Sequence, residues 1–443
     1  MINEQAMMLQ AGNDARQLEA SYQAARQTGA TAAFAAEIDA AYRAQPDNLL
    51  YAAWHYRLAG LSETMKPPSA NHWKIAIGLS VLCGFVFWLL SGVDQLFGAA
   101  QLNDLPFLAV AGAPIAAGFV MTFLALTSRQ HTKRLFVLII GMIGLVAYGW
   151  QMPTLLHPQI SANDYRTLLA LHVSLLAWVA VGIYVLWGIA QANNRFAFLI
   201  KSLEVIITGG LFAMAGGVFT AIVIGMFAAI GFKDLPESVL RLFFAGGAGL
   251  IPVLAVNIVY RPEASPLAQS FTEGLSKLIA ILMRLLLPLT LLVLLIYLAF
   301  IPFNFFEPFR NREVLIVYNG MLFAIMGLLI GATPVHASDL SAQQSVWLRR
   351  AMLAVAGLAA VVSLYAMAAI LYRTWQGGFT PNRLTVIGWN SINMGLLLLL
   401  LFKQWTAKPE NWLAHIHETV SIGINSYMLW GAIVIILLPW LFK

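Results

Sequence analysis

The chain has 443 residues, of which 60% are hydrophobic and only 10% are charged, against about 25% charged residues in an ordinary soluble domain. This composition excludes a soluble globular protein, because the chain lacks the polar residues needed to cover its own surface. The net charge of +6 does not indicate nucleic-acid binding, since the Lys and Arg residues stand singly or in pairs between apolar runs and form no basic stripe. The lone cysteine, Cys83, excludes an intrachain disulfide framework and a cysteine-based metal cluster.

The first stretch of the chain, residues 1–70, is polar and alanine-rich and is predicted to form a small cytoplasmic helical segment. Apolar residues recur at spacings of three and four over residues 34–42, which is typical of an amphipathic helix. The Pro-Asp-Asn sequence at residues 46–48 interrupts this pattern. Together with Trp54 the segment looks like one turn and helix of a tetratricopeptide unit, and a single unit cannot bury its own apolar face. We therefore expect a local helical hairpin that rests on the membrane domain.

A linker at Met65-Lys66-Pro67-Pro68 precedes a series of long apolar runs. A helical run of about 18 apolar residues crosses a hydrocarbon core of about 30 Å. The sequence thus predicts an all-α, polytopic membrane helix bundle over residues 71–443, with about eleven transmembrane helices embedded in the lipid bilayer. The last helix is the least distinct, because residues 408–422 are amphipathic and can also lie in the membrane interface. The predicted spans lie near residues 74–93, 106–127, 135–152, 167–190, 202–231, 239–260, 275–300, 313–332, 347–372, 384–403 and 423–441.

The distribution of basic residues predicts the orientation of this bundle. Lys and Arg residues are more frequent on the connections that are cytoplasmic when the N-terminus is cytoplasmic. The first outer connection, from Gly92 to Pro106, carries Asp94 and Asp104 and neither Lys nor Arg. We therefore predict a cytoplasmic N-terminus and an external C-terminus.

One basic residue, Arg284, stands inside the apolar run 275–300, where an unpaired guanidinium is costly. Pro288, four residues later, removes a backbone hydrogen bond and frees the carbonyl of Arg284. Lys277 lies seven residues before Arg284 and so shares its helix face. Two interpretations stay open: a substrate- or anion-facing site, or an arginine that extends its charge to the membrane edge.

A helix-to-helix corner is predicted at residues 372–384. Gly377 or Gly378 can take the left-handed cap of the preceding helix, while Thr380 is a good N-cap and Pro381 suits the first helical position. These are structural roles. Arg373 and Arg383 flank the corner, and a positive helix end with two arginines suits a phosphate or carboxylate. We predict that Arg373, Thr380 and Arg383 hold an anionic headgroup or an acidic side chain at the outer membrane surface.

The same corner carries a family resemblance. The pattern aromatic-Arg-x-x-x-x-Gly-Phe-Thr-Pro-Asn-Arg at residues 372–383, with the upstream Arg-Leu-Leu-Leu-Pro-Leu at residues 284–289 and Tyr297, resembles the bacterial polytopic membrane proteins grouped as domain of unknown function 4153. The resemblance runs from about Phe271 to Phe402 and departs after Ile301, where phenylalanines replace an expected glycine- and tryptophan-containing segment. It implies a bacterial envelope protein and no particular mechanism; we expect the bacterial inner membrane as its location. It adds weight to Arg284, Pro288, Thr380, Pro381 and Arg383.

Glycine clusters mark two neighbouring spans, at residues 209–225 and 246–249. Small residues let helices approach closely, and glycine-interrupted helices also mark transporter binding sites; we favour packing. Among the ionisable residues within spans, Glu204 lies three residues after Lys201 and can pair with it. His172 is expected to be a hydrogen-bonded core residue. The sequence His415-Ile416-His417-Glu418 does not predict a zinc site, because the two histidines point to different sides of a helix.

The sequence contains no P-loop, nucleophile elbow, HExxH helix or dinucleotide fingerprint, so no catalytic residue, cofactor or metal is predicted. Our first hypothesis is a transporter-like or channel-like protein whose cavity is lined by the spans near 202–231, 239–260 and 275–300, close to Arg284. A second is a non-catalytic partner or scaffold that docks a protein through residues 1–70. A third is an enzyme of envelope biosynthesis acting on a lipid-linked substrate.

Overall fold

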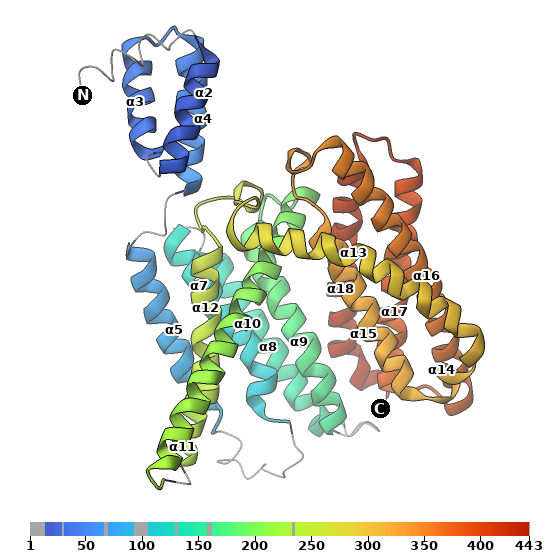
Figure 1. The fold of residues 1–443 in the computed structure, drawn as a ribbon. Helices are drawn as coiled ribbons and strands as arrows, with labels where there is room; N and C mark the ends of the chain where they lie inside the picture. The colour runs from blue at the N-terminus through green and yellow to red at the C-terminus, as the bar shows by residue number, and fades with distance from the viewer. Residues whose placement is uncertain are drawn as a thin grey trace. The chain divides into compact units, whose positions relative to one another are not determined.

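The computed structural model describes residues 14–28, 31–65, 70–92, 105–128, 132–156, 162–232 and 235–442. All regular secondary structure in these ranges is helical, which confirms the predicted all-α class (Figure 1). The chain divides into two compact units, Met1–Ser69 and Ala70–Lys443.

The described part of the first unit contains three helices with a core of their own: α2 (Ala15–Thr28), α3 (Thr31–Ala44) and α4 (Leu49–Met65). Leu18, Ile38 and Tyr51, one from each helix, are fully buried. The predicted interruption is confirmed, because the side-chain oxygen of Asn48 accepts from the backbone N–H of Leu50 at 3.0 Å and caps α4.

The prediction of a helical hairpin is wrong in the number of helices, because a third helix packs against the two of the hairpin. The additional helix, α2, covers the apolar face that α3 and α4 alone would expose, and Tyr22 of α2 packs against Phe34 and Trp54 with ring centroids 5.8 and 5.3 Å apart. Contact of this unit with the membrane domain stays a prediction.

The second unit is a helix bundle. Eleven helices in its described part are long and apolar enough to cross a membrane, in agreement with the predicted number. The spanning elements are α5 (Ala70–Leu90), α7 (Phe107–Ser128), α8 (Thr132–Leu156), α9 (Ala162–Leu186), α10 (Ala192–Ala229), α11 (Glu237–Arg241) continued by α12 (Gly247–Val259), α13 (Gly274–Phe300), α15 (Arg312–Ala332), α16 (Ala342–Gly377), α17 (Pro381–Thr406) and α18 (Trp412–Leu441). A π-helical turn, Leu242–Gly246, joins α11 to α12, and the short α14 (Glu307–Arg310) precedes α15.

Two helices, α10 and α18, begin ten or more residues before their predicted spans. Helix α18 is continuous from Trp412, so the amphipathic stretch that we considered for the interface forms its first turns. Helix α10 begins at Ala192, ten residues before the predicted span. Its polar first turns are held by tertiary bonds: the Asn194 side chain accepts from the backbone N–H of Leu267 at 3.2 Å, and Arg195 donates to Asn425 at 2.8 Å.

The two glycine clusters have different environments. A Cβ atom on Gly249 of α12 would meet the Cα of Gly84 on α5 at 2.8 Å, so these glycines allow the two helices to approach closely. On α10, a Cβ atom on Gly210, Gly216 or Gly217 would meet nothing within 4 Å. Close packing within the chain thus explains the cluster of α12 and not that of α10.

Candidate functional site

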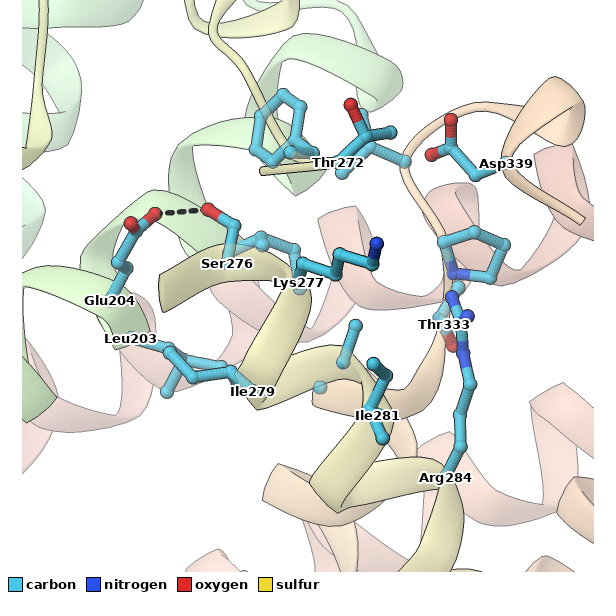
Figure 2. Close-up of a pocket in the computed structure, with 16 residues that line it drawn as sticks. Leu203, Glu204, Thr272, Ser276, Lys277, Ile279, Ile281, Arg284, Thr333 and Asp339 are labelled. Atoms are coloured by element: carbon cyan, nitrogen blue, oxygen red, sulfur yellow. Dashed lines mark hydrogen bonds between the residues drawn. The ribbon is translucent and has the colours of Figure 1, made fainter. Parts of the chain in front are cut away.

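A cavity of about 270 Å³ lies between α10, the first turns of α13 and the segment that follows α15 (Figure 2). Helix α10 contributes Glu204, and α13 contributes Ser276, Lys277 and Arg284. Apolar side chains from both helices, including Leu203 and Ile281, complete the wall. The cavity therefore combines charged groups with an apolar lining at one end of the bundle.

Two cations enter this cavity from one face of α13. Lys277 and Arg284 both line it, as their spacing of seven residues predicts, and Figure 2 shows both side chains directed to the same side. The Nε atom of Arg284 donates to the carbonyl oxygen of Ala332 at 3.1 Å. The ion pairs among the described residues involve other side chains, so neither cation is paired with a carboxylate within 4.0 Å. The terminal nitrogens of both groups are available to an anion.

Asp339 is the carboxylate on the same side of the cavity as the two cations (Figure 2). It belongs to a short 3-10 turn, Ala337–Asp339, and accepts from the backbone N–H of His336 at 3.2 Å. Neither Asp339 nor Thr333 was predicted from the sequence, because both lie in a connection between spans. The Ala-Ser-Asp sequence at residues 337–339 is typical of a turn, which was the one indication that Asp339 has a fixed position.

A buried polar network forms the opposite side of the cavity. The Lys201 ammonium donates to Glu204 at 2.6 Å and to the Ser276 hydroxyl at 3.1 Å. Ser276 donates to the same Glu204 oxygen, as Figure 2 shows. All three residues are buried, with exposed fractions of 5–7%. Lys201 also lies 5.1 Å from the ring centroid of Phe271. The predicted Lys201–Glu204 pair is present, and Ser276 is a partner that the sequence did not indicate.

A second cavity, of about 240 Å³, lies on the other side of this pair. Lys201 lines it together with residues of α7, α9 and α12, including Pro252 and Tyr260. The first hypothesis expected one cavity lined by α10, α12 and α13. The structure instead has α12 at the second cavity and α13 at the first, with Lys201 and Glu204 between them.

The predicted corner has the expected caps. The Thr380 hydroxyl accepts from the backbone N–H of Arg383 at 3.3 Å, and Pro381 is the first residue of α17. Gly378 ends α16 with φ 76° and ψ 167°. Its φ is positive as predicted, but its ψ is extended and not left-handed helical, in a region that essentially only glycine adopts.

Both arginines of the corner donate to backbone carbonyls. Arg373 donates to the carbonyl of Arg310 at 2.9 Å, and Arg383 donates to the carbonyl of Gly378 at 2.6 Å. The Arg383 guanidinium lies directly over Gly377, where an added Cβ would meet it at 2.8 Å. Neither arginine takes part in an ion pair among the described residues, so anion binding at this corner stays a prediction.

The predicted site residues fall into two separate places. Arg284 contacts the last residue of α15, whereas Arg373 contacts Arg310, two residues before α15 begins. Helix α15 has 21 residues, which corresponds to a length of about 30 Å. Pro288, which was predicted as a structural residue, lies inside α13, and this helix continues through it. The residue is exposed. The cavity and the corner therefore cannot act on one small molecule together.

The histidines have structural partners. The indole of Trp389 donates to His172 Nε2 at 3.0 Å, and His172 Nδ1 lies 2.7 Å from the carbonyl of Leu168. Because an indole only donates and a carbonyl only accepts, His172 is the neutral Nδ1–H tautomer. It is the hydrogen-bonded core residue that we predicted. His417 contacts Asn193 and the Pro334 carbonyl at 3.0 and 3.2 Å.

Comparisons with known proteins give no assignment, since no family model, curated protein or solved structure matches this chain. The fold and composition show a polytopic membrane protein.

Proposed function

We propose that this protein is transporter-like and binds the anionic part of its cargo in the cavity beside Arg284. The observation that carries the proposal is the convergence of Lys277 and Arg284 on one cavity without a paired carboxylate. Two like charges that face the same partly buried space repel each other, and an anion between them removes this repulsion. Arginine and lysine are also the side chains that bind carboxylate and phosphate groups.

The second cavity supports a transport role. Glu204 and Ser276 line the first cavity and Lys201 lines the second, so this buried ion pair has one member at each cavity. Ionisable residues within membrane spans commonly mark substrate or ion pathways. A pair in this position is suited to couple the two cavities, because a change at one member alters the partner of the other.

We further propose that the protein resides in a bacterial inner membrane with its N-terminus in the cytoplasm. The basic connections and the resemblance to domain of unknown function 4153 proteins support this location. In Figure 1 the first residues of α5, α10 and α13 lie at the same end of the second unit. In this orientation the cavity opens at the cytoplasmic end.

The proposal is tested with full-length protein in detergent and in liposomes. Inorganic phosphate is expected to raise the thermal unfolding temperature, and radiolabelled phosphate esters are expected to enter proteoliposomes. Lys277→Gln and Arg284→Gln should remove both effects, whereas Arg350→Gln, which neutralises an exposed arginine outside the cavity, should retain them. The proposal fails if the two cavity variants respond to these anions like the unsubstituted protein.

An observation on the first unit favours the second hypothesis, a partner that docks a protein through residues 1–70. This unit has its own core, yet Leu49 and Tyr56 are 86% and 66% exposed. Affinity purification in mild detergent tests this: a Leu49→Ser, Tyr56→Ala variant should lose a copurifying protein that the unsubstituted chain retains.

The envelope-enzyme hypothesis requires carboxylates that lie close together. Of the candidates, Asp94, Asp104 and Asp234 lie outside the described residues. Asp164, Glu237 and Glu307 stand at the starts of three different helices, and no observation favours it.

A further inference from the structure

The charged groups of the cavity lie at the edge of the membrane region. On α10, Glu204 is the last charged residue before the uncharged stretch 205–232. On α13, Arg284 is the last before the uncharged stretch 285–306. Each stretch exceeds the length of about 18 residues that crosses the hydrocarbon core. The cavity therefore lies at the depth where lipid headgroups begin.

The cavity is also continuous with the lipid-facing surface of α13. Ile281 lines the cavity and is 52% exposed. Leu278 and Leu285, on either side of it along the helix, are 60% and 68% exposed. Because exposed leucine and isoleucine on a membrane span face hydrocarbon, an acyl chain can run along α13 from the wall of the cavity.

The charges at this end of the cavity select the type of anion. Lys201 and Glu204 neutralise each other at 2.6 Å. The remaining groups are the cations Lys277 and Arg284 and the carboxylate of Asp339, which gives two positive charges minus one negative, or a formal charge of +1. A singly charged phosphodiester balances this charge, whereas a phosphomonoester dianion exceeds it.

We propose that the anion bound in this cavity is the phosphodiester of an amphiphile, with its phosphate between Lys277 and Arg284 and its acyl chains along the exposed face of α13. This inference rests on the proposed function, in which the cavity binds the anionic part of the cargo, and it adds the chemical class of that anion. The same phosphodiester chemistry is offered by a membrane phospholipid and by a free, deacylated phosphodiester. The apolar surface around Ile281 distinguishes them, because only the lipid can use it.

Native mass spectrometry of the full-length protein tests this with phosphatidylglycerol, phosphatidylcholine and the deacylated headgroup glycerophosphoglycerol. Phosphatidylglycerol should be retained in preference to phosphatidylcholine, whose choline cation the lysine and arginine would repel. Lys277→Gln and Arg284→Gln should each lower this retention by about tenfold, because each removes a charged hydrogen bond. Arg350→Gln should retain the lipid. Leu285→Ser should weaken lipid binding and leave glycerophosphoglycerol unaffected.

The possible failures are distinguishable. Binding of glycerophosphoglycerol as tight as that of the lipid would overturn the amphiphile assignment and leave the anion-binding function in place. Equal retention of both lipids in all variants would mean that the lipid only surrounds the protein, which also overturns the assignment. If the unsubstituted protein binds none of the phosphate compounds and is not stabilised by inorganic phosphate, the proposed function is overturned as well.

Discussion

The Nε atom of Arg284 donates a hydrogen bond of 3.1 Å to the carbonyl oxygen of Ala332, the last residue of α15. The last carbonyls of a helix have no partner within the helix, so this bond satisfies one of them and also fixes the guanidinium at the cavity. Arg284 thus joins α13 to the end of α15 and carries a charge that the proposed anion requires.

The shape of the Arg284 side chain should matter beyond its charge. In Arg284→Lys the single nitrogen that holds the Ala332 carbonyl is also the only one left for an anion, whereas the guanidinium keeps two further nitrogens free for a bidentate contact, so phosphate affinity should fall by about tenfold although the charge is kept. Lys277→Arg is the matched control, because Lys277 has no such backbone bond, and it should bind within about threefold of the original protein. Calorimetric titration with phosphate measures both, and equal affinity of Arg284→Lys and the original protein would contradict the assigned geometry.

The buried Lys201–Glu204 pair should be costly to break on one side only. Glu204→Met leaves the ammonium of Lys201 buried without its carboxylate, and we expect a loss of about 3–5 kcal/mol of stability. The double variant Lys201→Met, Glu204→Met removes both charges and should regain most of that loss. Thermal unfolding in detergent gives the comparison. A double variant as unstable as the single one would show that the pair is not the source of the effect.

The two glycine clusters should respond oppositely to alanine. Gly249→Ala places a methyl group against the backbone of Gly84, which should cost about 1–3 kcal/mol through overpacking. Gly217→Ala on α10 meets no neighbour and should be neutral or stabilise the helix by about 0.5–1 kcal/mol. Unfolding of both variants under the same conditions measures the difference, and similar effects at the two sites would contradict the close approach of α5 and α12.

Capping by Thr380 can be measured separately from any anion at the corner. Thr380→Ala removes the acceptor for the Arg383 N–H and should cost about 1 kcal/mol, while Thr380→Ser should retain the cap. Arg383→Ala should leave the fold largely intact and weaken a bound anion, if one is held there. Equal stability of the Ala and Ser variants would rule out a capping contribution.

Local features of this chain were predictable because they depend on neighbouring residues. The caps at Thr380 and Pro381 follow from residue type within one corner, as does the positive φ of Gly378 but not its extended ψ. The Lys201–Glu204 pair follows from a spacing of three on one helix. The spans follow from the length of apolar runs, and only their polar ends were misplaced, as at Ala192 of α10.

Features that join distant segments were not predictable from the sequence. Ser276 reaches Lys201 across 75 residues, and Asp339 approaches the cations of α13 from a connection after another span. For the same reason, the prediction placed Arg284 and Arg383 in one set of site residues, whereas the structure places them at two separate sites. Single-helix patterns locate a residue along the membrane normal but do not say which other helix it faces. For the first unit, they likewise did not indicate that α2 covers the apolar face of α3 and α4.

The most direct test is a cryo-EM structure of the full-length protein isolated from its native membrane. We expect density for a phosphate-sized group within hydrogen-bonding distance of both Lys277 and Arg284, continued by chain density along Ile281 and Leu285. An empty cavity in which Lys277 and Arg284 are paired with Asp339 would contradict the proposal that this cavity binds an anion.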